Sequence, residues 1–227
     1  MNNVPVRRGD QIIAVLENVN GDLPADHRGT GIADDSQPVT AAMRRLASDM
    51  LIEAAHPLDD LVRALLEPPH YRLVVSRHID AIVTPSDLRK LPMRVLVYAQ
   101  LAHLEATMLA TINALFPTDE DAVSALEAGA QAQLLHDLSR MHDKHLDPPL
   151  LELTSLKQKG LILLTREVFS GSPNVVADEL DDLYDGLRNP LVHAASYVND
   201  SLPALTKLSR QLGAIARWTD EAAAAAR

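Results

Sequence analysis

An arginine and a histidine lie five positions apart in the segment GLRNPLVHA, residues 186–194. Arg188 carries a permanent positive charge that can hold a phosphate, and His193 titrates near neutral pH and can transfer a proton. Such a pair is suited to cleavage of a phosphodiester by an internal hydroxyl group, which requires no metal. The alternative is that Arg188 pairs with an acidic residue of its own segment while His193 lines a helical core. The nearest acidic residues are Asp181, Asp182 and Asp185.

The Asn189-Pro190 step between the two basic residues is typical of a helix start, with the asparagine as N-cap and the proline in the first helical position. We therefore expect the helix to break here and to begin again at Pro190, with its first backbone amides available to an anion. On an unbroken helix, five positions separate two side chains by about 140° of rotation. The expected break would allow Arg188 to turn toward His193.

The segment LRNPLVHA, at the start of a late helix in an expected helical bundle, resembles the arginine, four-to-six residues, histidine signature of HEPN domains. The resemblance implies a metal-independent endoribonuclease that acts as a homodimer, with two motifs meeting at the interface. It implies that Arg188 and His193 are the catalytic pair and that Asn189 shapes the motif. In a toxin subgroup, a partner nucleotidyltransferase modifies a tyrosine two residues after the histidine. That position is Ala195 here, and Tyr197 is the nearest tyrosine.

Two other groups of residues could support chemistry at this site. Glu105, in the first helix of the expected bundle, could orient His193, or it could be a partly exposed acid. Lys157 and Lys159 could form a basic patch that contacts RNA, or they could be ordinary surface lysines.

The histidine-rich stretch HDLSRMHDKH could chelate a metal through His142 and His145, which are three residues apart and flank Asp143; His136 begins the same stretch. A solvated polar helix face explains the same residues more simply. We therefore predict no metal site.

A second motif lies earlier in the chain, in the segment TPSD. Thr84 fits a helix N-cap, Pro85 the first helical position, and Asp87 the acid of a capping box. The surrounding residues 54–90 predict a helix, two strands and a further helix, and they resemble a CBS motif. In CBS pairs that bind adenosine nucleotides, this Thr and Asp contact ribose and phosphate, so the resemblance implies a possible adenine-nucleotide site at Thr84 and Asp87. The usual glycine before the second strand is Ala81, and a complete site would need a second motif from the N-terminal segment or from a second chain.

The elements that must position these residues are mainly helical. Hydrophobic residues make up 47% of the 227-residue chain but aromatic residues only 3%, which favours cores of aliphatic side chains between helices. We expect one helix from residue 39 to a break at His56-Pro57, a short helix through Leu66, and strands in YRLVV and AIV. From Pro92 we expect a long helix with one buried stripe, then helices over 119–145, 150–169, 175–187 and 202–227. The stripe comprises Val97, Leu101, Leu104, Met108, Ile112 and Leu115.

These elements predict, within residues 1–91, an unassigned N-terminal segment followed by a small α/β CBS-like unit at about 54–90, and an antiparallel HEPN-like bundle in residues 92–227. The net charge of −10 argues against binding a long nucleic acid through the average field. The chain has no cysteine, which excludes disulfides and thiolate sites. We find no signal peptide and no stretch of membrane-spanning length, and so expect a soluble cytoplasmic protein.

Two functions fit the sequence. The first is a metal-independent endoribonuclease of HEPN type, acting as a homodimer on RNA in a toxin, defence or stress-response role, with no required cofactor. The second is a non-catalytic CBS-like module that senses an adenine nucleotide and binds a protein partner. Solvent access of Arg188 and His193 in a shared cleft would favour the first, whereas burial of both in ion pairs would indicate a purely structural role.

Overall fold

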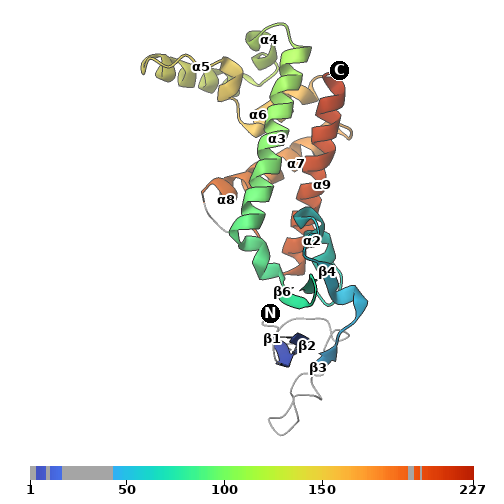
Figure 1. The fold of residues 1–227 in the computed structure, drawn as a ribbon. Helices are drawn as coiled ribbons and strands as arrows, with labels where there is room; N and C mark the ends of the chain where they lie inside the picture. The colour runs from blue at the N-terminus through green and yellow to red at the C-terminus, as the bar shows by residue number, and fades with distance from the viewer. Residues whose placement is uncertain (1–3, 9–10, 17–42, 194–196, 200) are drawn as a thin grey trace. The chain divides into compact units, whose positions relative to one another are not determined.

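The computed structural model is mainly helical, as the composition predicts (Figure 1). It describes residues 4–8, 11–16, 43–193, 197–199 and 201–227. The chain divides into two compact units. Unit 1 comprises residues 1–93 and 198–209, and unit 2 comprises residues 94–197 and 210–227. Residues 198–209 thus group with unit 1, whereas the sequence interpretation assigned all of 92–227 to the bundle.

The described part of unit 1 contains two three-stranded sheets. The first is antiparallel, in the order β1 (Val4–Arg8), β2 (Gln11–Leu16) and β3 (Met43–Arg45). The second has the order β4 (Leu51–Glu53), β5 (Arg72–Val75) and β6 (Ile79–Val83). In this second sheet β4 runs parallel to β5, and β6 runs antiparallel to it. The predicted strands in YRLVV and AIV are therefore confirmed.

Helix α2 (Leu58–Leu66) connects β4 to β5, and a 3₁₀ helix, η3 (Pro85–Arg89), follows β6. Both were predicted. The helix expected from residue 39 to residue 55 is wrong, because this stretch contains β3, a 3₁₀ turn η2 (Ser48–Met50) and β4. Leu51 of β4 pairs with Leu73 of β5, so the sheet determines its conformation over the helical pattern of its sequence. Val15, Met50, Tyr71 and Leu73 form a common core under the two sheets.

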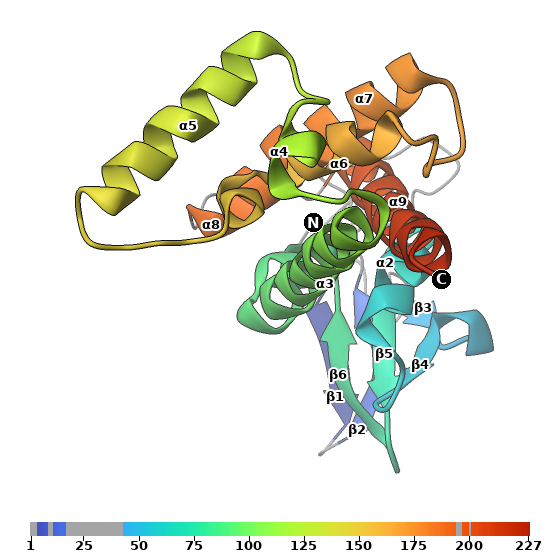
Figure 2. The same ribbon diagram turned by 90° about the horizontal axis from the view of Figure 1, so that it is seen from above.

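Unit 2 is built around two long helices, α3 (Leu91–Leu115) and α9 (Leu202–Ala225), which both begin in unit 1 residues (Figures 1 and 2). The shorter helices are α4 (Asp119–Val123), α5 (Ala128–His142), η4 (Leu150–Leu153), α6 (Leu156–Leu164), α7 (Pro173–Leu183), η5 (Tyr184–Arg188) and α8 (Asn189–Val192). The single helix expected over 119–145 is wrong, because the chain leaves the helix after Val123 and starts α5 at Ala128. The helix expected over 150–169 is likewise divided into η4 and α6.

Helix α3 buries the stripe that the sequence predicted. Five of its six members are buried, and only Leu115, at the end of the helix, is partly exposed. Helix α3 is also long and apolar enough, by length and composition, to span a membrane, so the expectation that no segment reaches that length is wrong. The core helix of a soluble protein meets the same criterion, and α3 carries such a core stripe.

Tight packing joins the helices of unit 2. Trp218 of α9 is fully buried, and its ring lies 5.3 Å from the ring of Phe169. Gly160 of α6 lies directly against the buried side chain of Leu180 on α7, where a Cβ atom at residue 160 would overlap the leucine methyl groups. The α6–α7 contact therefore depends on the absence of a side chain at residue 160.

Candidate functional site

The segment that carries Arg188 and His193 is one continuous helix. Helix α7 continues through η5, a π turn, directly into α8. Arg188 and Asn189 both have helical backbone angles, and Asn189 caps no helix start. The predicted break at Asn189-Pro190 is therefore wrong, and so is the anion-attracting helix start expected there.

The π turn explains how the helix accepts Pro190. A proline inside an α-helix lacks one hydrogen-bond donor, and its ring clashes with the preceding turn. Here the amide of Asn189 bonds to the carbonyl of Tyr184, five residues earlier, so the turn just before the proline is widened. Such π turns occur often at functional sites. The sequence interpretation recognised the proline but not this way of accommodating it.

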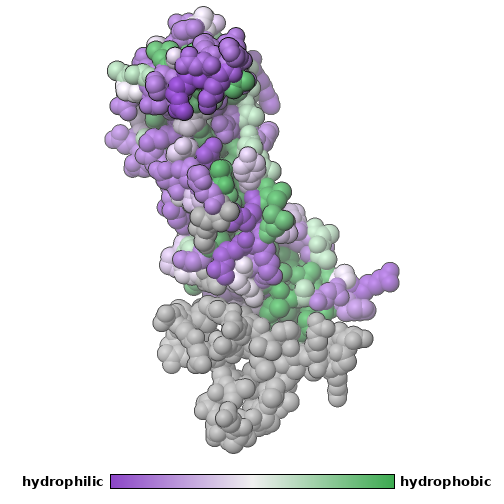
Figure 3. Space-filling view, turned by 90° about the vertical axis from the view of Figure 1, so that its left-hand side faces the viewer, coloured by the Kyte–Doolittle hydropathy of each residue, from purple (hydrophilic) through white to green (hydrophobic). Residues whose placement is uncertain are grey.

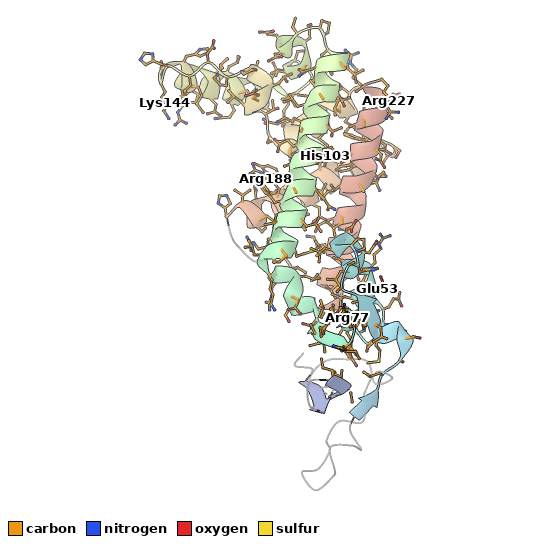
Figure 4. The ribbon with its side chains drawn as sticks, viewed as in Figure 1. Glu53, Arg77, His103, Lys144, Arg188 and Arg227 are labelled. Atoms are coloured by element: carbon orange, nitrogen blue, oxygen red, sulfur yellow. The ribbon has the colours of Figure 1, made fainter. Side chains whose placement is uncertain are left out.

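The guanidinium of Arg188 is held by neutral groups. Its carbon atom lies 5.6 Å from the centre of the Tyr184 ring, and Nη1 donates a hydrogen bond of 3.3 Å to Oδ1 of Asn189. Nδ2 of Asn189 in turn donates to Oδ1 of Asp185 at 3.1 Å. Arg188 is half-buried and forms no ion pair among the described residues. Figure 4 labels Arg188 where the π turn meets α8.

The three acids that could have neutralised Arg188 have other partners. Asp181 forms an ion pair of 2.5 Å with Lys157 of α6. Asp182 accepts hydrogen bonds from Arg210 and Gln211 of α9. Asp185 binds the side-chain amide of Asn189. The alternative interpretation, in which Arg188 forms an ion pair with an acid of its own segment, is therefore wrong.

His193 follows α8 and is exposed to solvent. Its backbone amide bonds to the carbonyl of Asn189, so the residues from 188 to 193 keep helical spacing. At this spacing the side chains of Arg188 and His193 leave the helix about 140° apart, and no hydrogen bond joins them among the described residues. The continuous helix therefore presents the two groups in different directions.

Arg94 of α3 holds the end of α8. Its Nη2 donates a hydrogen bond of 3.0 Å to the carbonyl of Leu191, and its guanidinium lies 5.8 Å from the ring centre of Tyr197. Burial raises the pKa of Tyr197 to about 12, although the charge of Arg94 acts in the opposite direction. The Tyr197 hydroxyl is thus a neutral, buried group. Ala195, the position of the modified tyrosine in the toxin subgroup, lies outside the described residues.

Glu105 and Lys159 are paired with each other rather than with the motif. Nζ of Lys159 donates to Oε1 of Glu105 at 3.0 Å and also to the carbonyl oxygen of Thr154. The side chain of Lys159 is only 3% exposed, whereas that of Glu105 is 35% exposed. The proposed role of Glu105 in orienting His193 is therefore not what the structure shows.

The expected basic patch is absent from the described residues. Lys159 is buried, and Lys157 is committed to Asp181, whose hydrogen bond raises the pKa of the lysine above its usual range. The histidine-rich stretch lies at the end of α5, where His142 pairs with Asp147 at 2.9 Å. No cluster of metal ligands is found among the described residues.

Thr84 and Asp87 form a local helix cap in unit 1. Oδ2 of Asp87 accepts from the backbone amide of Thr84 at 2.7 Å and from its hydroxyl at 2.9 Å, and Oδ1 forms an ion pair of 2.6 Å with Lys90. Burial alone would raise the pKa of Asp87, but the hydrogen bonds from Lys90 and Thr84 outweigh it and lower the pKa. Both carboxylate oxygens therefore already have partners, and Ala81 is exposed on β6.

Comparisons with models of protein families, with curated proteins and with solved structures found no match for this chain.

Proposed function

We propose that the protein is a metal-independent endoribonuclease of HEPN type that acts as a homodimer, with Arg188, Asn189 and His193 in its active site. One observation carries the proposal. Arg188 lies beside three acids and pairs with none of them, since neutral groups hold its guanidinium and the acids have other partners. An arginine kept without a carboxylate, close in sequence to an exposed histidine, remains available to a phosphate.

The reaction would follow from the chemistry of these groups. Arg188 would bind the scissile phosphate and stabilise its developing negative charge. His193 would take the proton of the ribose 2′-hydroxyl, which attacks the phosphorus as the bond to the 5′-oxygen breaks. The departing 5′-oxygen would take a proton from water. The products would be a 2′,3′-cyclic phosphate and a 5′-hydroxyl end. The proposed reaction requires no cofactor.

A homodimer would explain how Arg188 and His193 can act together although they point in different directions on one chain. Because Arg188 and His193 leave one helix about 140° apart, an arginine of one chain and a histidine of another would meet more readily than the pair within one chain. A surface for a second copy is available on α3, whose exposed side carries apolar residues beside polar ones. Its exposed side includes Val95 and Tyr98, each more than half exposed, with Ala99 and Ala102 between the polar residues.

Figure 3 shows one side of the molecule, on which green hydrophobic patches interrupt a mostly purple hydrophilic surface. Exposed apolar patches of this kind are typical of interaction sites. The acidic charge near the motif, from Asp185 and its neighbours, would repel a long RNA backbone. We therefore propose that the substrate is a short or flexible single-stranded RNA loop, cleaved in the cytoplasm in a toxin, defence or stress response.

The test is cleavage of labelled structured and single-stranded RNAs in EDTA. The parent protein should cleave and leave cyclic-phosphate ends, whereas Arg188→Ala and His193→Ala should each lower the rate at least about 100-fold. The matched controls are Arg140→Ala and His136→Ala, which remove an exposed arginine and an exposed histidine of α5, away from the motif. Equal loss in the controls, or no cleavage by the parent protein, would refute the proposal.

The dimer is tested in the same assay. Arg188→Ala and His193→Ala should each cleave only at the lowered rate when alone. An equal mixture would form mixed dimers in which one arginine and one histidine remain to meet across the interface. Partial recovery of activity supports the composite site, and its absence in a mixture shown to exchange subunits argues against it. If the parent protein does not cleave but adenine nucleotides stabilise it against heat, the non-catalytic nucleotide sensor becomes the better proposal.

A further inference from the structure

A concave pocket lies in unit 2, away from the Arg188–His193 segment in sequence, where the α4–α5 connection meets α6 and the start of α7. Its volume is about 440 Å³, which lies in the range of pockets that hold small organic molecules. Figure 2 shows α4, α6 and α7 gathered on one side of the unit, with α5 extending from them.

The walls of the pocket are mainly aliphatic. Leu161 and Leu164 are one turn apart on α6 and remain partly exposed there, while Leu126 is buried and Ala130 contributes the first turn of α5. When an apolar ligand covers leucines that are partly exposed to solvent, the removal of their surface from water favours binding. The pocket therefore favours a ligand with an aliphatic or aromatic body.

The polar groups of the pocket are mostly hydrogen-bond acceptors or negative. Glu127 is the only ionisable residue among the lining residues, and it is exposed without an ion-pair or hydrogen-bond partner among the described residues. The hydroxyl proton of Thr165 is donated to the carbonyl of Ile162, which leaves its oxygen as an acceptor. Thr165 also caps the carboxyl end of α6, the negative end of the helix dipole.

Other groups of the pocket act in the opposite sense. Glu127 is the N-cap of α5 and Pro173 begins α7, so the amino ends of two helices, which favour negative charge, also border the pocket. Gln158 uses its side-chain oxygen to accept from the amide of Ser155, which leaves its NH₂ group as a donor. The charge of Lys157 is close enough to Glu127 for each to affect the other, but its ammonium group is paired with Asp181. Glu127 therefore remains the charge that a ligand would meet.

We propose that this pocket binds a small amphiphilic amine, a molecule with an apolar body of roughly eight carbons and a cationic head that pairs with Glu127. The apolar walls bind the body, and the carboxylate of Glu127 selects the charge of the head. This site is independent of the proposed ribonuclease activity, since none of its residues belongs to the Arg188–His193 segment.

The experiment measures binding of three probes with the same eight-carbon body: octylammonium, octanol and octanoate. Titration calorimetry with the full chain should give saturable one-to-one binding of octylammonium, at least about tenfold tighter than that of octanoate, because an exposed carboxylate attracts one head and repels the other. In Glu127→Gln the ratio should fall below about threefold. Asp143→Asn, which removes a carboxylate at the far end of α5, about 24 Å away along the helix, should leave the ratio unchanged.

Two further variants test the walls. Leu164→Trp and Ala130→Leu each fill the pocket from a different helix, and either variant that keeps the parent's circular dichroism spectrum should lose binding of all three probes. Binding that does not saturate, or that survives both filled pockets, would place the probes elsewhere on the surface and overturn the proposal. An unchanged charge preference in Glu127→Gln would also overturn it.

Discussion

The buried pair of Lys159 and Glu105 predicts an asymmetry between two substitutions. Glu105→Gln keeps a hydrogen-bond acceptor near Nζ but leaves an ammonium group, 3% exposed, without a counter-charge. Breaking a buried pair in this way costs about 3–5 kcal/mol. Lys159→Met leaves a carboxylate that is 35% exposed and can recover water, so its cost should be about 1 kcal/mol, mainly from the lost bond to Thr154.

Urea unfolding followed by tryptophan fluorescence measures this difference. Trp218 is the one tryptophan of the chain and is fully buried in unit 2, so its signal reports the unit that contains the pair. With a slope of about 2 kcal/mol per molar urea, Glu105→Gln should lower the midpoint by about 1.5–2.5 M. Lys159→Met should lower it by about 0.5 M.

The double variant Lys159→Met/Glu105→Leu provides a control for the argument. Replacing both charges with apolar groups should restore most of the stability that Glu105→Gln loses, because no buried charge is left unpaired. If Lys159→Met proves as destabilising as Glu105→Gln, the cost lies in packing rather than in an unpaired ammonium group, and the reasoning is refuted.

Three other substitutions have expected outcomes. Gly160→Ala would place a Cβ atom 2.7 Å from Cδ1 of Leu180 and should destabilise by about 1–3 kcal/mol despite the better helix propensity of alanine; a gain in the urea midpoint would contradict the close contact. Tyr197→Phe should flatten the stability curve between pH 10 and about 12, where the parent loses stability because its buried phenol holds its proton longer than the unfolded chain does; parallel curves for the two proteins would argue against a buried neutral phenol. Asp87→Asn should cost about 1 kcal/mol at neutral pH and nothing well below pH 3, because the lowered pKa of Asp87 contributes stability that is lost as pH falls below its ordinary value of 3.8; thermal melts of both proteins across this range measure the loss, and a pH-independent difference would count against it.

The elements that could be predicted from the sequence are those whose pattern is local or strongly periodic. The stripe from Val97 to Ile112 repeats at three and four residues over a long helix, and the capping acid Asp87 acts within one turn. Strand β4 was missed because its conformation depends on pairing with β5, which is distant in sequence. Its apolar residues fit a helix as well as a strand.

The candidate site was predicted in its residues but not in its geometry. The exposure of His193 and the lack of an ion pair at Arg188 depend on which partners the acids find, and those partners lie on other helices. The contact between Tyr184 and Arg188 could have been suspected from their four-residue spacing, which brings two side chains to one side of a helix. Nothing local indicated that Glu105 would meet Lys159.

Because of the π turn at residues 184–188, the number of residues in this segment does not by itself determine the direction in which its later side chains point. A π turn contains one residue more than the α-helical turn that it replaces, so deleting one residue there would allow an ordinary α-helix to form. After such a deletion the later residues would keep their directions, and Leu191 would stay aligned with the buried Leu183. If the π turn were instead lost with no residue removed, every later residue would turn by about 100°. A related sequence with the same residue count but an ordinary α-helical turn would keep the arginine-to-histidine spacing and yet present both groups to a different neighbour. The spacing within the motif is therefore insufficient to identify the site, and the π turn must be preserved as well.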